Sequence, residues 1–207
     1  MTVHEPATLA TDYLLAAAAA ALARRLHRRI SPENRAARWW VWTLGLTAAS
    51  AFIGGSYHGF APNFTATTHQ LWWLSTLWTV CLIGAAMAAG WVCAVMSPPR
   101  RQRTMWVVAG KFFAFSTLAA FHPAFSIAIL DYGISMVLWL GAALVLRRAW
   151  SGWMLAAIGL SIAAALGQQL HLAPAPWFNH NDLYHVLQAL ALTAFYRAAL
   201  RLESSPA

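Results

Sequence analysis

The sequence is poor in charged residues, and above all in acidic ones. Of its 207 residues, 10% are charged, and only 6 are Asp or Glu. Soluble domains average about a quarter charged residues. Hydrophobic residues make up 60% of the chain. This composition excludes a disordered chain, a collagen-like fibre and an ordinary soluble domain, and it predicts an integral membrane protein.

Cysteine is equally scarce. The two cysteines, Cys81 and Cys93, lie on one long apolar segment. Along a helix their separation corresponds to about 18 Å, which is too far for a disulfide. We therefore interpret both as packing residues rather than as a disulfide or a chemical site.

Long apolar runs fill most of the chain, and seven of them can be distinguished. At about 20 residues a span, the length allows one all-α domain over residues 1–207, with short loops and no second domain. A membrane β-barrel is excluded because its strands alternate in polarity, whereas these runs are continuously apolar. The runs cover approximately residues 9–23, 39–60, 66–96, 105–121, 125–146, 150–171 and 182–200.

The basic residues predict how the helices are oriented. With seven spans, all 14 Lys and Arg residues fall on the same side of the membrane. Basic loops mark the cytoplasmic side, so we expect the N-terminus outside and the C-terminus in the cytoplasm. A net charge of +8 also occurs in nucleic-acid-binding proteins, but this one-sided arrangement favours membrane orientation, and we expect no nucleic-acid partner. The basic residues are Arg24, Arg25, Arg28, Arg29, Arg35, Arg38, Arg100, Arg101, Arg103, Lys111, Arg147, Arg148, Arg197 and Arg201.

Histidines gather on the opposite side. Six of the eight fall at the predicted outer ends of helices two to seven, and Asp131 and Asp182 accompany them. Ionisable groups at membrane depth are costly and mark functional sites by default. The pattern therefore indicates a shared site near the outer face. The six histidines are His58, His69, His122, His171, His180 and His185.

The seventh helix opens with a polar segment, Asn179-His180-Asn181-Asp182-Leu183-Tyr184-His185. Asp182 and His185 are three residues apart and share a helix face. His180 lies five residues before His185, about 140° around the helix, so it does not easily join the same metal. Asn179 followed by Asp182 also fits a helix N-cap with a capping box. Capping does not account for His185.

Three imidazoles from helices two, three and seven suit a zinc ion. We predict His58, His69 and His185 as metal ligands, with a water in the fourth position, as in catalytic zinc sites. Asp182 is the first candidate for proton transfer or for orienting a ligand, and His180 is the second. Unrelated interfacial histidines are the alternative interpretation.

Asp131 lies about a third of the way along the fifth run and needs a polar partner there. The candidates are His122, Tyr132 and a water in the site. Asp131 then either handles protons or ties two helices together, and the sequence leaves both roles open.

This pattern resembles the CREST superfamily, which includes alkaline ceramidases, progestin and adiponectin receptors and hemolysin III-like proteins. The resemblance implies seven helices and a zinc site towards the N-terminal side, with His58 as the ligand from helix two and His185 as one from helix seven. Three positions differ from the family pattern. Gly54 replaces its serine, His69 replaces its aspartate, and Asn181 replaces the first histidine of its His-xxx-His.

The resulting prediction is a divergent bacterial member of that superfamily in the inner membrane. Its expected activity is zinc-dependent hydrolysis of a lipid amide or ester near the outer face. The expected partners are membrane lipids, one of them as substrate. Two alternatives stay open, namely a haem or quinone redox subunit and a non-enzymatic subunit or receptor-like protein.

Overall fold

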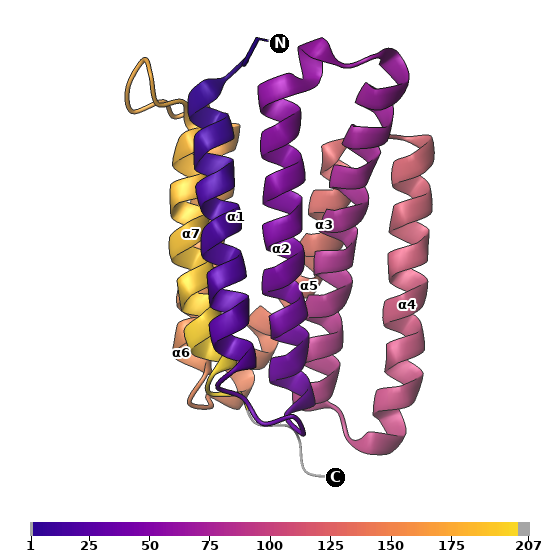
Figure 1. Cartoon of the computed structure of the whole chain (residues 1–207). Coiled ribbons are helices and arrows are strands. Elements are labelled where there is room, and N and C mark those ends of the chain that lie inside the picture. The colour runs from indigo at the N-terminus through magenta and orange to yellow at the C-terminus, as the bar shows by residue number, and fades with distance from the viewer. Residues whose placement is uncertain (1, 203–207) are drawn as a thin grey trace.

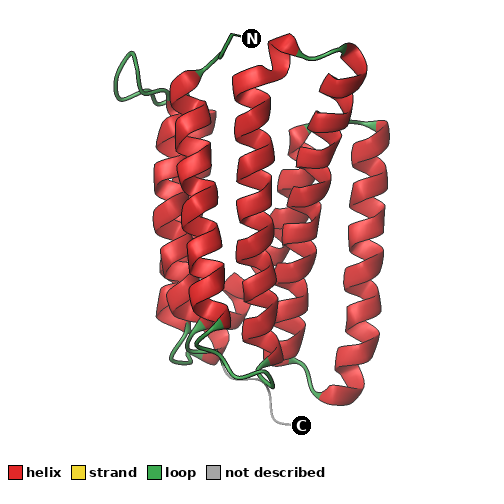
Figure 2. Cartoon of the chain, viewed as in Figure 1, coloured by secondary structure: helices red, strands yellow, loops and turns green. Residues whose placement is uncertain are grey.

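The computed structural model describes residues 2–202, and every long element in that range is a helix (Figure 2). The all-α membrane fold predicted from the sequence is therefore confirmed at this level. The elements are α1 (Pro6–His27), α2 (Arg35–Phe60), the 3-10 turn η1 (Ala61–Asn63), α3 (Ala66–Val95), α4 (Pro98–Phe121), α5 (Phe125–Leu146), α6 (Ser151–Gln169) and α7 (His180–Ala199).

Local sequence signals set the ends of these helices. The side chains of Asn34, Thr65 and Asn179 cap α2, α3 and α7 by accepting backbone N–H groups. His122, followed by Pro123, ends α4 as expected. Several helices extend beyond the predicted apolar cores, because arginine and alanine favour helix even outside the membrane. Thus α4 begins at Pro98 rather than near residue 105.

Five of the helices are long and apolar enough to cross a membrane. They are α1, α3, α4, α5 and α6. The other two long helices, α2 and α7, have 26 and 20 residues but carry polar ends, with arginines at the start of α2 and the Asn-Asp-His segment at the start of α7. A polar end lowers the mean hydropathy of a helix without shortening it.

The bundle is built around α3. This helix packs against α2, α4 and α5, while α1 lies between α2 and α7, and α6 packs against α7 (Figure 1). The core between them contains Trp40, Met87, Trp139 and Phe195. By contrast, α4 buries only Ala119 among its residues. The first and last helices are therefore neighbours, and α4 lies at the edge.

The two ends of the bundle differ in chemistry. The connections after α1, α3 and α5 lie together at the end opposite the N-terminus (Figure 1). Those connections and the helix ends beside them hold the arginines. The other end holds the N-terminal segment, the turn η1 and the start of α7, so it gathers the histidines.

Candidate functional site

A buried carboxylate and a buried imidazole face each other between the first and last helices. Asp12 comes from α1 and His185 from α7, and the two residues are only 5% and 7% exposed. Asp12 Oδ1 lies 3.1 Å from His185 Nε2. The second oxygen, Asp12 Oδ2, is enclosed and has no hydrogen-bond partner within residues 2–202.

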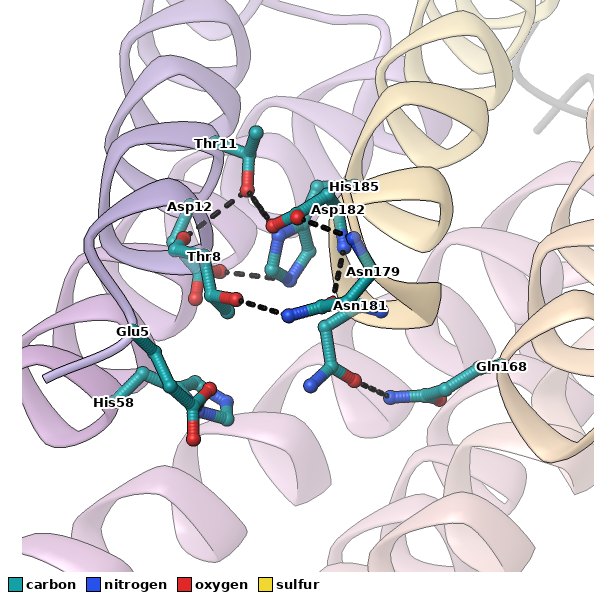
Figure 3. A network of polar contacts seen from close by, with 10 residues as sticks. All are labelled: Glu5, Thr8, Thr11, Asp12, His58, Gln168, Asn179, Asn181, Asp182 and His185. Carbon is teal, nitrogen blue, oxygen red and sulfur yellow. Dashed lines mark hydrogen bonds and ion pairs between the residues drawn. The ribbon is translucent and has the colours of Figure 1, made fainter. Parts of the chain in front are cut away.

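Thr11 holds the other side of the imidazole. Its hydroxyl oxygen lies 2.9 Å from His185 Nδ1 and 3.2 Å from Asp182 Oδ1 (Figure 3). Thr11 thus links the histidine to a second carboxylate, which is fully buried. Because two helices supply these groups, the position of His185 depends on how α1 packs against α7.

Asp182 is fixed by the cap of its own helix. Its Oδ2 accepts the Asn179 backbone N–H at 2.7 Å, while Asn179 Oδ1 accepts the backbone N–H groups of Asn181 and Asp182. This capping box was one of the two interpretations of the sequence, and it is confirmed. The Asn179 amide also donates to Thr8 Oγ1 at 3.1 Å, which fastens the start of α7 to α1.

One arrangement of the protons places the Thr11 hydrogen on the contact with Asp182. A hydroxyl has one hydrogen, and among the acceptors near Thr11 the Asp182 carboxylate is the strongest. With Thr11 donating to Asp182, the His185 Nδ1–H donates to Thr11, and Nε2 is left as a lone-pair acceptor. Across from it stands Asp12 Oδ1, also an acceptor. In this tautomer the two acceptors, 3.1 Å apart, need a proton or a cation between them, whereas in the other tautomer Nε2–H donates directly to Asp12 Oδ1.

His58 lies beside this pair, on α2. Its Nδ1 is 3.1 Å from Glu5 Oε2, and the two side chains are 35% and 51% exposed. Figure 3 shows them at the margin of the same network. A buried pair and a more exposed rim therefore make up the site, with three helices and the N-terminal segment contributing.

The other predicted site histidines have different partners. His69 Nε2 lies 2.7 Å from the Tyr57 hydroxyl, and the His180 ring packs edge-on against the His171 ring, with centroids 4.7 Å apart. His58, His69 and His185 thus each bind a separate group. In the described range, 2–202, no three His, Cys, Asp or Glu side chains lie together as a metal-binding group. The zinc ligand set named from the sequence stays a prediction.

Several residues of this site were missed in the sequence. Asp12 sits in an alanine-rich run that has the character of an ordinary span, and Glu5, Thr8 and Thr11 precede or flank it. One signal was present, since Asp12 is the single acidic residue inside the first apolar run. A lone carboxylate at that depth predicts a partner.

Asp131 belongs to a separate buried pair. Its partner is Lys111 on α4, with Nζ 2.5 Å from Asp131 Oδ1 and 3.2 Å from the Asp131 backbone oxygen. The expected partners, His122, Tyr132 or a water, are therefore corrected to Lys111. Gly84 on α3 makes room for the carboxylate, because a Cβ there would collide with Asp131 Oδ2.

The fold and these contacts describe an all-helical membrane protein with a carboxylate–histidine cluster buried between its first and last helices. The chain belongs to a family of unknown function, DUF6962, which matches residues 7–204. No curated protein and no solved structure matches it. The resemblance to the CREST superfamily stays a prediction.

Proposed function

We propose that the protein is a seven-span membrane hydrolase that uses a zinc-like metal to cleave a lipid amide or ester. In this proposal α2 and α7 also cross the membrane, and the histidine-rich end faces outward. The observation that carries the proposal is the close approach of two potential ligand atoms, Asp12 Oδ1 and His185 Nε2, which lie 3.1 Å apart. A metal ion satisfies both atoms.

Asp12 and His185 support such an ion in spacing and chemistry. Zinc takes nitrogen and carboxylate oxygen ligands at about 2.0–2.2 Å in a tetrahedron, which separates neighbouring ligand atoms by roughly 3.3 Å. Asp12 and His185 stand close to that separation. His58, already in the set predicted from the sequence, is our third ligand, from the rim, and Asp12 takes the place of His69. A histidine, a carboxylate and a second histidine leave one position open, as catalytic zinc sites do.

The surrounding residues then have defined roles. Asp182 holds the Thr11 hydroxyl, and Thr11 in turn contacts His185. Asp182 therefore serves as the carboxylate behind a metal ligand, which fixes the tautomer and orientation of the imidazole. Since both oxygens of Asp182 already accept hydrogen bonds, we assign it as a positioning residue rather than as the catalytic base. The metal, when bound, supplies a water of lowered pKa and polarises the carbonyl.

The location of the site favours a membrane lipid as the substrate. The site lies between helices near one end of the bundle, where an acyl chain in the outer leaflet has direct access to the rim formed by Glu5 and His58. These side chains are among the exposed members of the network. An amide or ester carbonyl sits at the same depth in common membrane lipids, below the headgroup.

A second candidate function is favoured by one observation. The described residues hold no assembled three-ligand group, and a single shared proton would also satisfy Asp12 and His185. The cluster would then tie α1 to α7 in a non-enzymatic membrane subunit. The two candidates differ in metal content, which can be measured directly.

The test is elemental analysis of detergent-purified protein beside three single variants. We expect about one zinc per chain in the wild type. The zinc affinity should fall at least tenfold in His185→Ala and in His58→Ala, and it should not change in His69→Ala. The last is the matched control, because it removes an outer-end histidine outside the proposed set. Wild-type protein without metal after metal-replete purification would overturn the proposal in favour of the helix tie.

Activity is measured on the same four proteins. Each is placed in vesicles that contain N-acylated and O-acylated lipids, and released fatty acid is followed by mass spectrometry. We expect release by the wild type and His69→Ala only, and its loss on chelation with recovery on adding zinc. Zinc binding without any release would retain the metal site and reject the hydrolase.

A further inference from the structure

A basic cleft opens at the opposite end of the bundle from the histidines. It has a volume of about 820 Å³ and lies between the start of α2, the end of α3 and the start of α4. Its lining combines two kinds of side chain, arginine and tryptophan. The main lining residues are Arg35, Arg38, Arg101, Trp39, Trp42 and Trp106.

The arginines leave most of their donors available. Among residues 2–202, the ion pairs are His58–Glu5, Lys111–Asp131 and His185–Asp12, so none of the three cleft arginines pairs with a carboxylate. Arg101 donates one Nη2 bond to the Met96 carbonyl at 3.3 Å, and its Nε is enclosed without a partner in the described range. A guanidinium has five N–H donors in a fork that matches phosphate oxygens.

The rest of the cleft is apolar and continues onto the outer surface of the bundle. Trp42 and Trp106 are 62% and 74% exposed, and Val107 and Phe113 on α4 are exposed as well. Because α4 lies at the edge of the bundle and buries only Ala119, its apolar face is free to contact lipid chains. Exposed tryptophan is typical of the level where headgroups meet hydrocarbon.

We propose that this cleft binds an anionic glycerophospholipid from the leaflet that faces the basic end. The phosphate lies among Arg35, Arg38 and Arg101, and the acyl chains extend along the exposed faces of α2 and α4. Basic pockets between membrane helices on the cytoplasmic side bind anionic headgroups in this way. The inference does not depend on the hydrolase, since it concerns the other end of the molecule and a ligand rather than a substrate.

A lipid fits the cleft better than a free anion. A small soluble anion would use the arginines alone, and it would leave the tryptophans and the α4 face without an occupant. A phospholipid matches both halves of the cleft. Its phosphate lies at the depth of the arginines, and its acyl chains begin at the depth of the tryptophans. Arg101 and Trp106 both line the cleft from α4 and lie about 7.5 Å apart along its axis, so the lining runs from guanidinium to indole along the expected path from headgroup to chain.

The test is native mass spectrometry of the detergent-purified protein with added lipid. We expect one phosphatidylglycerol bound per chain, at least tenfold more tightly than phosphatidylcholine. Arg35→Gln combined with Arg101→Gln should weaken phosphatidylglycerol binding at least tenfold. The matched control, Arg24→Gln with Arg28→Gln, removes the same charge from exposed positions at the same end but outside the cleft, and it should change binding less than twofold.

Two further arms decide between the sources of the ligand. Inorganic phosphate at millimolar concentration should not displace the lipid; full displacement would assign the cleft to a soluble anion and overturn the proposal. Ala109→Trp fills the cleft without changing charge, so it should abolish binding even if the arginine variants fold poorly. Equal losses in the cleft and control arginine pairs would also overturn the proposal, since binding would then reflect net charge alone.

Discussion

Asp12 and Asp131 are both buried among helices, and each has one oxygen without a hydrogen-bond partner in the described part of the chain. Their partners differ. Asp131 faces Lys111, which carries a positive charge of its own, whereas Asp12 faces a histidine nitrogen that accepts or donates according to the tautomer of His185. One pair carries its own positive charge, and the other has room for an added proton or metal when Nε2 is the acceptor.

This difference separates a structural ion pair from a site that can take up a ligand. A fixed cation and a carboxylate neutralise each other. Removing one partner leaves the other charge unpaired in a medium of low dielectric constant. A carboxylate that faces a nitrogen lone pair can bind a proton or a metal cation between the two atoms. Burial alone would have marked both carboxylates as functional, so the chemistry of the partner is what distinguishes them.

The largest expected effect comes from breaking the Lys111–Asp131 pair. Asp131→Asn leaves Lys111, 13% exposed, without its counter-charge, and we expect a loss of about 3–5 kcal/mol in the free energy of unfolding. Detergent-based unfolding titrations measure this. Adding Lys111→Met to the same chain removes both charges and should restore at least half of the loss. A single variant as stable as wild type would contradict the pairing.

A middle-sized effect is expected from Thr11→Val, which keeps the shape of the side chain and removes the hydroxyl. The buried Asp182 Oδ1 and His185 Nδ1 then lose their common partner, at a cost of about 1–3 kcal/mol. Metal affinity should fall about 10–100-fold, as for other outer-shell partners. Thr11→Ser, which keeps the hydroxyl, should retain most of both properties. A drop in stability with metal affinity unchanged would reject the positioning role.

The smallest stability effect is expected from Asp12→Asn, and it sharpens the comparison most. The amide can donate to His185 Nε2 and so replace the shared proton, so in chelated protein we expect a change of less than about 1 kcal/mol. Bound zinc should nevertheless be lost. A cost as large as that of Asp131→Asn would mean that Asp12 is a charged structural partner rather than a ligand.

Most of the fold could be predicted because apolar periodicity is a local property. A few adjacent residues are enough to predict each of three features: the long apolar runs, the end of a helix at His122-Pro123 and the helix cap at Asn179. The seven-span count and the orientation stay predictions. The helices α2 and α7 carry polar groups, so their mean hydropathy does not distinguish a membrane span from a surface helix.

The site was less predictable because its contacts join distant parts of the chain. His185 and Asp182 could be named from their spacing within one helix. Their partners Thr11 and Asp12 lie more than 170 residues earlier, and no local pattern in a single sequence records which helices become neighbours. For the same reason His69 was grouped with His58, although it bonds to Tyr57.

The contact of Asn179 with Thr8 has a consequence for biosynthesis. It joins α1 to the start of α7, so the cluster cannot form until α7 has been synthesised and has packed against α1. A truncated product that ends before α7 carries Asp12 and Thr11 but neither Asp182 nor His185. Assembly of the cluster at this end of the bundle is therefore coupled to the synthesis of α7.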